Sequence, residues 1–404
     1  MAASSSASRT RSSLSDNILI EIFTYLPLNS IYKFKCLSKV WLSNFSSPNF
    51  IYKWFQINNK SLPWIHYHTI AYSGSKRKLG FRNAYIDLHS EFMHRNEHLF
   101  SFQFLMNEKP FLGCKLDLLG SSNGLVLFQS VPRSGYQKRG YYVCNPLTQK
   151  WVSLPSPPRS KAKGGLATSG IFCDNSSFNS SCYKVVHIPE FDTPSKNFNV
   201  DLFCSDLGVW KSFQVSCDEN VQWRQSMYRE VVILNGVLFR IEKLKRMFVY
   251  NLNQNNGSGG HQCSVINMPD EESGLLNFSG CIGESEGGVC YTKTTWKGME
   301  MVMSIWVLDK VNWQILHKDI SVNNIFAEFR RVGDAAPVHV LGFSPVDRNV
   351  VFFGCKDWLW GFNIQTRSLE ELCMGNGHLS NPCLMVQPFV LKPMPTVLPP
   401  PSCD

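Results

Sequence analysis

The chain has 404 residues, 44% of them hydrophobic and 18% charged, with a formal net charge of +9 at pH 7. This length and composition predict a large buried core shared by two or more domains, or by one small and one large domain. The positive charge is moderate and spread along the chain, so by itself it does not indicate nucleic-acid binding. No run of residues approaches the ~20 apolar residues of a membrane span.

The 14 cysteines are scattered, no C-x-x-C pair occurs, and the first residues lack the apolar segment of a secretory signal. We therefore expect a reducing intracellular location, in the nucleus, the cytoplasm or both, where most cysteines serve as small buried apolar groups. Residues 1–11 and the proline-rich residues 393–404 are expected to be disordered.

Residues 13–54 organise the chain, because they form a run of short amphipathic segments. Ile18 and Ile22 belong to one apolar face of a first helix, which Ser15 or Asp16 can cap at its start. Pro27 is expected to end this helix, since proline lacks the backbone donor and clashes with the preceding turn. Further helices are expected from Asn29 or Ser30, over Val40–Phe45 and over Phe50–Phe55.

This stretch resembles an F-box. The matching residues are Leu14, Asp16, Ile22, Phe23, Leu26, Pro27, Leu28 and the run Lys35–Trp41. The stretch departs from the family at Ser15, where proline is usual, and at Leu42, where arginine is usual. A packed helical subdomain without a partner is the alternative interpretation of the periodicity alone.

The F-box resemblance implies docking to a Skp-type adaptor, and through it to the cullin scaffold and the RING subunit of a ubiquitin ligase. The residues expected to contact the adaptor are Leu14, Ile22, Leu26, Pro27, Leu28, Ile31, Cys36, Leu37, Val40 and Trp41. Some of them are expected in the core instead, because each helix of a small bundle must bury one face.

From about Leu116 the sequence repeats a glycine before a short apolar run, a strand ending in Asn or Asp, and a further strand that usually carries an aromatic residue. The Asn and Asp anchors, which suit turns, are Asn145, Asp206, Asn251, Asp309 and Asn363. They are about 45 to 60 residues apart, the period of four-stranded propeller blades. We interpret the glycine as a point of close backbone approach and the tryptophans of the last strand as wedges between blades.

Five units are visible, and a sixth, composite blade is expected to pair Phe100–Met106 with Cys383–Leu391, which would remove free sheet edges. The alternative is a β-sandwich of unrelated hairpins. The fold class is thus α+β, with a small helical F-box followed by an all-β, kelch-like propeller of about six blades. The expected domains are an F-box at 12–58, a linker and propeller-closing segment at 59–110, and the propeller at 111–392.

The repeat region resembles the kelch-type, F-box-associated domain of plant F-box proteins. The phrases that carry this resemblance are Cys144–Thr148 with Trp151 and Leu154-Pro155, and Tyr183–Val186. The double glycine of strict kelch repeats occurs only at Gly287-Gly288 among the five units.

A search for catalytic motifs leaves no residue on which an enzymatic role could rest. His94, Glu97 and His98 match the H-x-x-E-H pattern of one metalloprotease class, but a polar helix between domains is the better interpretation. His66 and His68 would share one side of a strand, as paired surface histidines often do. We expect no cofactor, no metal and no catalytic residue.

Between Leu118 and Cys173 the chain has no Asp or Glu, yet it has a series of basic residues in expected loops. The candidate client-binding rim consists of Arg133, Lys138, Arg139, Arg159, Lys161 and Lys163. Solvated loops are the simpler interpretation, whereas the functional one is a basic rim that receives an acidic protein surface.

Together the two resemblances imply the substrate-recognition subunit of a Skp–cullin–F-box (SCF) ubiquitin ligase, which is not itself an enzyme. Its F-box would bind the adaptor, its propeller would bind an unidentified protein client, and neither nucleic acid nor a membrane is expected as a direct partner. The alternatives are a propeller enzyme or ligand-binding protein with a helical cap, and an F-box protein that sequesters a partner without degrading it.

Overall fold

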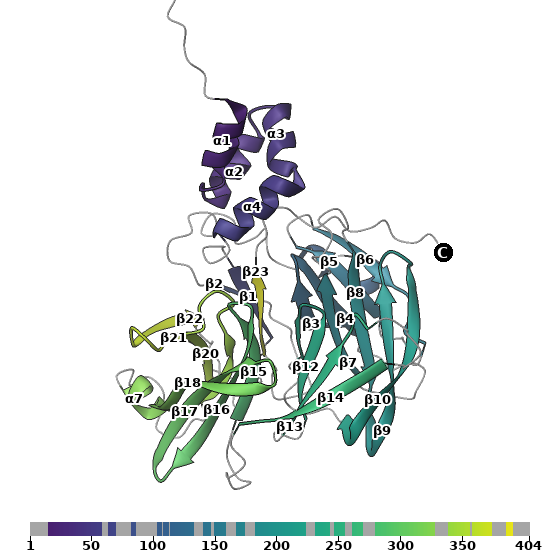
Figure 1. The fold of residues 1–404 in the computed structure, drawn as a ribbon, viewed down its shortest axis with the longest axis vertical. Coiled ribbons are helices and arrows are strands. Elements are labelled where there is room, and N and C mark those ends of the chain that lie inside the picture. The colour runs from purple at the N-terminus through teal and green to yellow at the C-terminus, as the bar shows by residue number, and fades with distance from the viewer. Residues whose placement is uncertain are drawn as a thin grey trace, which may run out of the picture. The chain divides into compact units, whose positions relative to one another are not determined.

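The computed structural model divides the chain into two compact units, Met1–Leu62 and Pro63–Asp404. It describes residues 15–58, 64–69, 82–85, 103–106, 108–112, 114–132, 140–146, 149–158, 167–173, 182–223, 231–242, 246–254, 261–269, 279–327, 338–355, 358–373 and 385–390. The first unit is helical, and the second consists mainly of strands (Figure 1).

The described residues of the first unit, 15–58, form four short helices. These are α1 (Asp16–Phe23), α2 (Leu28–Lys35), α3 (Lys39–Ser46) and α4 (Pro48–Asn58). The prediction that Pro27 ends the first helix is wrong, because α1 already ends at Phe23 and Pro27 stands at the N-cap of α2. The fixed φ of proline suits a helix start as well as it opposes a helix interior. Ser15 is the N-cap residue of α1, but its side chain makes no capping hydrogen bond.

Aromatic side chains form the centre of this unit. Phe23 of α1 packs edge-on against Trp41 and Phe45 of α3, with ring centroids 5.0 and 5.1 Å apart. Trp54 of α4 is buried, and its indole N–H donates to the carbonyl of Leu26 over 2.7 Å. These contacts hold the first and last helices against the same core.

In its described parts, the second unit contains three four-stranded antiparallel sheets and one eight-stranded sheet. In the eight-stranded sheet, two four-stranded antiparallel blades are joined by parallel pairing of Val215–Cys217 with His261–Cys263. The strands of the first two blades are β3 (Cys114–Ser122), β4 (Leu125–Pro132), β5 (Gly140–Asn145) and β6 (Lys150–Leu154), then β7 (Ala167–Cys173), β8 (Tyr183–Pro189), β9 (Phe191–Cys204) and β10 (Val209–Trp223). Those of the third are β11 (Val231–Leu234), β12 (Val237–Glu242), β13 (Arg246–Asn251) and β14 (His261–Asn267). The fourth and fifth contain β15 (Ser279–Ser285), β16 (Gly288–Lys297), β17 (Glu300–Asp309) and β18 (Asn312–Ser321), then β19 (His339–Phe343), β20 (Val350–Cys355), β21 (Trp358–Asn363) and β22 (Ser368–Cys373).

A sixth blade joins the two ends of this unit. Its strands are β1 (Trp64–Thr69), β2 (Arg82–Tyr85) and β23 (Met385–Val390), in the order β2-β1-β23. The first strands of the five other blades and β23 contact one another in the cyclic order β3, β7, β11, β15, β19, β23 and back to β3. The second unit is therefore a closed six-bladed β-propeller.

For the closing blade, the predicted late strand is confirmed and its predicted partner is wrong. The late strand exists as β23, but its partner is β1 and not the segment Phe100–Met106. Gln103–Met106 forms the short helix α6, and Leu105 within it is fully buried. The apolar character of this segment therefore reflects burial in a helical turn and not a strand.

The repeating glycines lie in hairpin turns. Positive φ angles occur at both residues of Asn123-Gly124, Asn235-Gly236 and Glu286-Gly287, each between directly paired strand ends. Two consecutive positive φ angles define the type I′ turn, which matches the twist of a β-hairpin. Turn geometry therefore accounts for the repeated Gly124 and Gly236, and at Gly236 a close approach of the Asn253 side chain adds to it. The repeated glycine of the fourth unit, Gly288, is the first residue of the strand that follows its turn.

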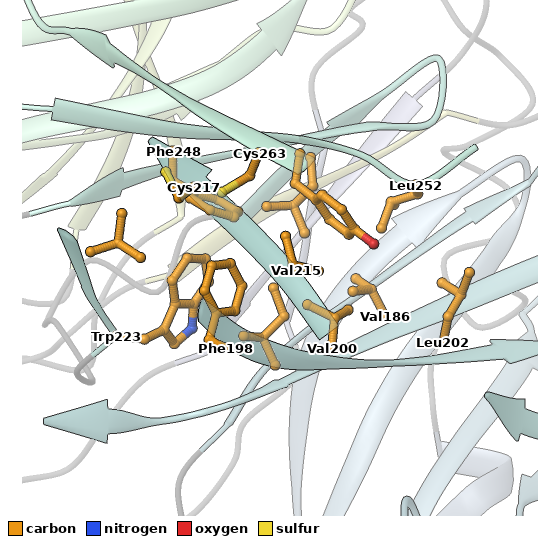
Figure 2. Packing of buried hydrophobic residues seen from close by; sticks show 14 of the residues in the cluster. Val186, Phe198, Val200, Leu202, Val215, Cys217, Trp223, Phe248, Leu252 and Cys263 are labelled. Carbon is orange, nitrogen blue, oxygen red and sulfur yellow. The ribbon is translucent and has the colours of Figure 1, made fainter. Parts of the chain in front are cut away.

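Apolar side chains from neighbouring blades fill the space between them. Between the second and third blades, Val186, Val200 and Val215 face Phe248 and Cys263 (Figure 2). The last strand of a blade also bonds to the blade before it. The indole N–H of Trp210 donates to the Pro155 carbonyl over 2.7 Å, and that of Trp313 donates to the Asn267 carbonyl over 3.0 Å. The prediction that these tryptophans lie between blades is confirmed.

Candidate functional site

The helical unit exposes an unusual number of large apolar side chains. They are Ile18, Ile22, Tyr25, Leu37, Val40, Leu42 and Ile57. A unit with a well-packed aromatic core gains nothing from exposing them, and such exposed apolar groups commonly mark a protein-binding surface. The part of this set formed by Ile18, Ile22, Tyr25, Leu37 and Val40 is the candidate functional site.

Helix α1 is apolar on two sides. Phe23 points inward to Trp41, whereas Ile18 and Ile22 are exposed. The latter two lie four residues apart, so they share one face of the helix, and Tyr25 continues in the same direction. The inward residues hold the helix in place, and the outward ones remain available to a partner.

The turn between α2 and α3 contributes a second part of the surface. Ser38 caps α3 by accepting a hydrogen bond from the Trp41 amide over 3.2 Å. Trp41 stacks on Phe45 at 5.3 Å inside the unit, while Leu37 and Val40 are 67% and 61% exposed. The cap thus fixes two exposed apolar side chains at the start of α3.

Lysines surround this turn. Lys33 and Lys35 lie in the last turn of α2, and Lys39 begins α3. Burial lowers the pKa of Lys35, whose ammonium lies 5.6 Å from the centre of the Tyr32 ring. An apolar centre with a basic border favours a partner whose matching surface is acidic.

The structure divides the predicted adaptor-binding residues into groups. Ile22, Pro27, Cys36, Leu37 and Val40 are exposed, whereas Leu26 and Trp41 are partly buried. Ile31 is only 2% exposed, so its side chain lies in the core and not on the surface. Leu14 lies outside the described residues, as does the side chain of Leu28.

Sequence reasoning did not select Ile18 and Tyr25 as contact residues. The available signal was that Ile18 and Ile22 share one face of α1, on a helix whose other apolar residues were already sufficient for a core.

All six residues of the candidate client-binding rim lie outside the described residues. Arg133, Lys138 and Arg139 fall between the end of β4 and the start of β5, and Arg159, Lys161 and Lys163 fall between β6 and β7. These strand ends belong to one face of the propeller, because alternate connections of an antiparallel blade open on the same side.

The described part of the chain has no group of three or more His, Cys, Asp or Glu side chains that could hold a metal ion. The H-x-x-E-H motif at His94–His98 lies outside the described residues, and His66 and His68 lie in β1. A pocket of about 420 Å³ is bordered by β14 and the start of β18, and no titratable side chain lines it.

One polar row in the second blade, with His187 and Asp201 buried and Ser212 exposed, contains the residue types of a hydrolase triad. Asp201 accepts a hydrogen bond from Ser212 over 2.6 Å, and its other carboxylate oxygen lies 3.6 Å from Nδ1 of His187. Asp201 is therefore the central member. A nucleophilic serine needs histidine as its direct neighbour to accept its proton, so this order does not activate Ser212.

No helix in the described residues is long and apolar enough to cross a membrane.

A helical unit with an exposed apolar surface, followed by a β-propeller, defines the class of F-box proteins with a propeller domain. Residues 11–53 match the F-box domain, and residues 96–396 match the family described as "F-box protein At3g26010-like, beta-propeller". The chain belongs to this family of F-box β-propeller proteins. An F-box generally binds Skp-type adaptors, and proteins of this family are generally non-catalytic adaptors.

Similar proteins occur in Arabidopsis thaliana. F-box protein At3g26010 is 25% identical over 386 residues, which cover 93% of this chain and 83% of that protein. Putative F-box/kelch-repeat protein At4g22430 is 26% identical over 373 residues, which cover 88% and 79%. Putative F-box protein At3g23950 is 25% identical over 317 residues, which cover 74% and 71%.

Proposed function

We propose that this chain is the substrate-recognition subunit of an SCF-type ubiquitin ligase. The F-box binds a Skp-type adaptor, which connects it to the cullin scaffold and the RING subunit, and the propeller binds a protein client. A conjugating enzyme carrying ubiquitin is thereby held near lysines of the client. The chain acts by raising an effective concentration and performs no chemistry of its own.

The exposed apolar surface of the helical unit is the observation that carries this proposal. Ile22, Leu37 and Val40 are 47%, 67% and 61% exposed, and Ile22 and Val40 are each followed by an aromatic residue, Phe23 or Trp41, that packs inward. Burying one such side chain against a partner contributes roughly 1.5–3 kcal/mol. Several of them acting together can support a stable complex.

The test is co-purification of the full chain with a plant Skp-type adaptor, comparing wild type with Ile22→Glu and Val40→Glu. The matched control is Leu42→Glu, because Leu42 is also exposed but lies about 200° around α3 from Val40. We expect a stoichiometric wild-type complex, at least tenfold weaker binding by the two variants, and little change in the control.

Circular dichroism of each variant separates lost binding from lost folding. A folded wild-type chain that does not bind the adaptor would contradict the proposed function. Equal loss in the control would show that any added charge on the unit prevents binding, and that the assigned surface is wrong.

We further propose that the basic rim formed by Arg133, Lys138, Arg139, Arg159, Lys161 and Lys163 attracts an acidic client surface in the nucleus or cytoplasm. Charge reversal at Lys138 and Arg139 should then weaken client capture. Capture should also weaken in 0.5 M salt, where the Debye length is only about 4 Å. Capture that is unchanged in high salt would contradict this role of the rim.

A further inference from the structure

A hairpin tip in the fourth blade presents two large apolar side chains to solvent. The hairpin tip is the segment Trp296–Met301, where β16 turns into β17. Trp296 is 49% exposed and Met299 is 95% exposed. Methionine and tryptophan are enriched where one protein docks on another, and such exposure at the end of a hairpin does nothing for the propeller core.

The turn itself is tight. Lys297 pairs with Glu300, so only Gly298 and Met299 form the loop, and Gly298 has a φ of +64°. A positive φ at the first loop residue alone is the geometry of a type II′ turn, which fits the twist of the two strands. Met299 is therefore held on a short, well-defined turn.

Neighbouring elements brace the hairpin tip from the side. Asn323 of α7 (Val322–Ala327) accepts a hydrogen bond from the Met301 amide over 3.2 Å and donates one to the Met299 carbonyl over 3.4 Å. The helix lies against β17 (Figure 1). Because the turn residue Met299 and the start of β17 after it are both bonded to α7, the Met299 side chain extends from a fixed base.

A bulge in β18 supplies a further brace. Asp319 has a φ of +53°, and its amide donates to Ser304 Oγ over 3.0 Å. Its carboxylate accepts from Lys297 over 2.7 Å. A left-handed conformation at a residue other than glycine costs free energy, so the surrounding contacts must hold it there. Here it places the carboxylate against the hairpin tip.

Among the described residues, the charges on the hairpin tip and next to it in the sequence balance. Lys297 is paired with Asp319, and Glu300 in the tip and Lys318 beside Asp319 have opposite signs. A partner would therefore contact an apolar surface beside which the described charges cancel. The complementary surface on that partner is uncharged and apolar, unlike the acidic surface expected opposite the basic rim.

We propose that the hairpin tip binds the protein client by inserting Met299 into an uncharged apolar pocket, with Trp296 packing at the edge of that pocket. This inference rests on the proposed function, since the client is what such a subunit would capture. It names a second contact to the client, with a chemistry different from that of the basic rim.

The experiment places a photoreactive diazirine amino acid at position 299 of the full chain, bound to its Skp-type adaptor, and irradiates it in plant extract. The control carries the same group at Val311, which is also highly exposed but lies in the β17–β18 turn. Unlabelled wild-type chain and the variants Met299→Asp and Trp296→Ala serve as competitors. Their folding is checked by thermal unfolding.

We expect a protein that is cross-linked from position 299 and not from position 311. Wild-type chain should compete at least tenfold better than Met299→Asp, the range for a central interface side chain, and Trp296→Ala should be intermediate. The yield should persist in 0.5 M salt. Cross-linking equal to the control, equal competition by the variants, loss in high salt, or cross-links only to a second copy of the chain would overturn the proposal. Adaptor binding in the same samples reports separately on the proposed function.

Discussion

Two glycines occupy equivalent turn positions in neighbouring blades but have different surroundings. Gly236 and Gly287 have φ angles of +77° and +71°, so alanine at either position adopts a disfavoured backbone conformation. A Cβ at Gly236 would also collide with the Asn253 side chain, whereas nothing lies within 4 Å of a Cβ at Gly287. The pair therefore separates backbone strain from side-chain collision.

We expect Gly287→Ala to lower the free energy of unfolding by ~1–2 kcal/mol, and Gly236→Ala to lower it by about 1 kcal/mol more. Urea unfolding of the two variants measures the difference. Equal losses would show that Asn253 moves aside at no cost, although its amide oxygen accepts a hydrogen bond from Lys184.

The polar row of the second blade gives a second prediction at this scale. Asp201 is fully buried and accepts from Ser212, with His187 close by. Asp201→Ala removes the acceptor and leaves the buried His187 without its neighbouring carboxylate, so it should cost ~2–4 kcal/mol in unfolding free energy. Asp206→Ala, at an exposed position, should change it by less than about 0.5 kcal/mol. Similar unfolding midpoints for both variants would contradict a structural role for the row.

Some residue roles could be predicted from the sequence, because they depend only on neighbours along the chain. Asn251 accepts from the Asn253 amide over 2.9 Å, and Asn363 accepts from the Gln365 amide over 2.9 Å, as the prediction of turn residues requires. The row of His187 and Asp201 could not be predicted, since it exists only once the strand registers are set. The same holds for Ile31 and Ile22, whose different exposure depends on tertiary packing.

At the scale of secondary-structure elements, the four helices of the first unit and most outer strands were predictable. The short helices α6 and α7 and the first strand of each of the five consecutive blades were not. Local amphipathicity indicates a helix, and an apolar run between turn residues indicates a strand. The first strands are short or rich in small residues: β11 has four residues, and β15 reads SGCIGES. They form strands because each pairs with the next strand through a tight turn. Their own sequences show little hydrophobic periodicity that would indicate a strand.

The tryptophan bonds between blades give a prediction for an element. Trp210 near the start of β10 donates to the Pro155 carbonyl and packs against Phe203 at 5.5 Å. Trp210→Phe keeps an aromatic ring but removes the donor, so we expect a loss of ~1 kcal/mol in unfolding free energy. Trp210→Ala also leaves a cavity and should cost ~3–5 kcal/mol.

Denaturant unfolding of both variants tests this role, with Trp296→Phe as the control at an exposed tryptophan. Equal stability of wild type and Trp210→Phe would show that the indole fills space between the blades without bonding them. A loss as large for Trp296→Phe would show that the effect is not specific to the boundary between blades.

At the scale of the whole molecule, closure of the propeller depends on two strands that are far apart in the sequence. β23 pairs with β1 from Trp64↔Val390 to Thr69↔Met385, and it contacts both β19 and β3. The sequence indicated that a late strand closes the ring, but it could not identify the partner. Several apolar segments before residue 110 could have paired with it, and nothing local distinguishes them.

Removing β23 should therefore open the propeller while leaving the helical unit intact. We expect truncation after Cys383 to lower the thermal midpoint of the propeller by about 10 °C or more, because a six-residue ladder and two contacts between blades are lost together. Truncation after Lys392 keeps β23 and should leave the midpoint unchanged. Both truncated chains should still bind the Skp-type adaptor, since residues Met1–Leu62 form a separate compact unit. An unchanged midpoint after the longer truncation would mean that the remaining blades are stable as an open ring and that closure serves another purpose, such as protecting the edges of β1 and β3 from pairing with other chains.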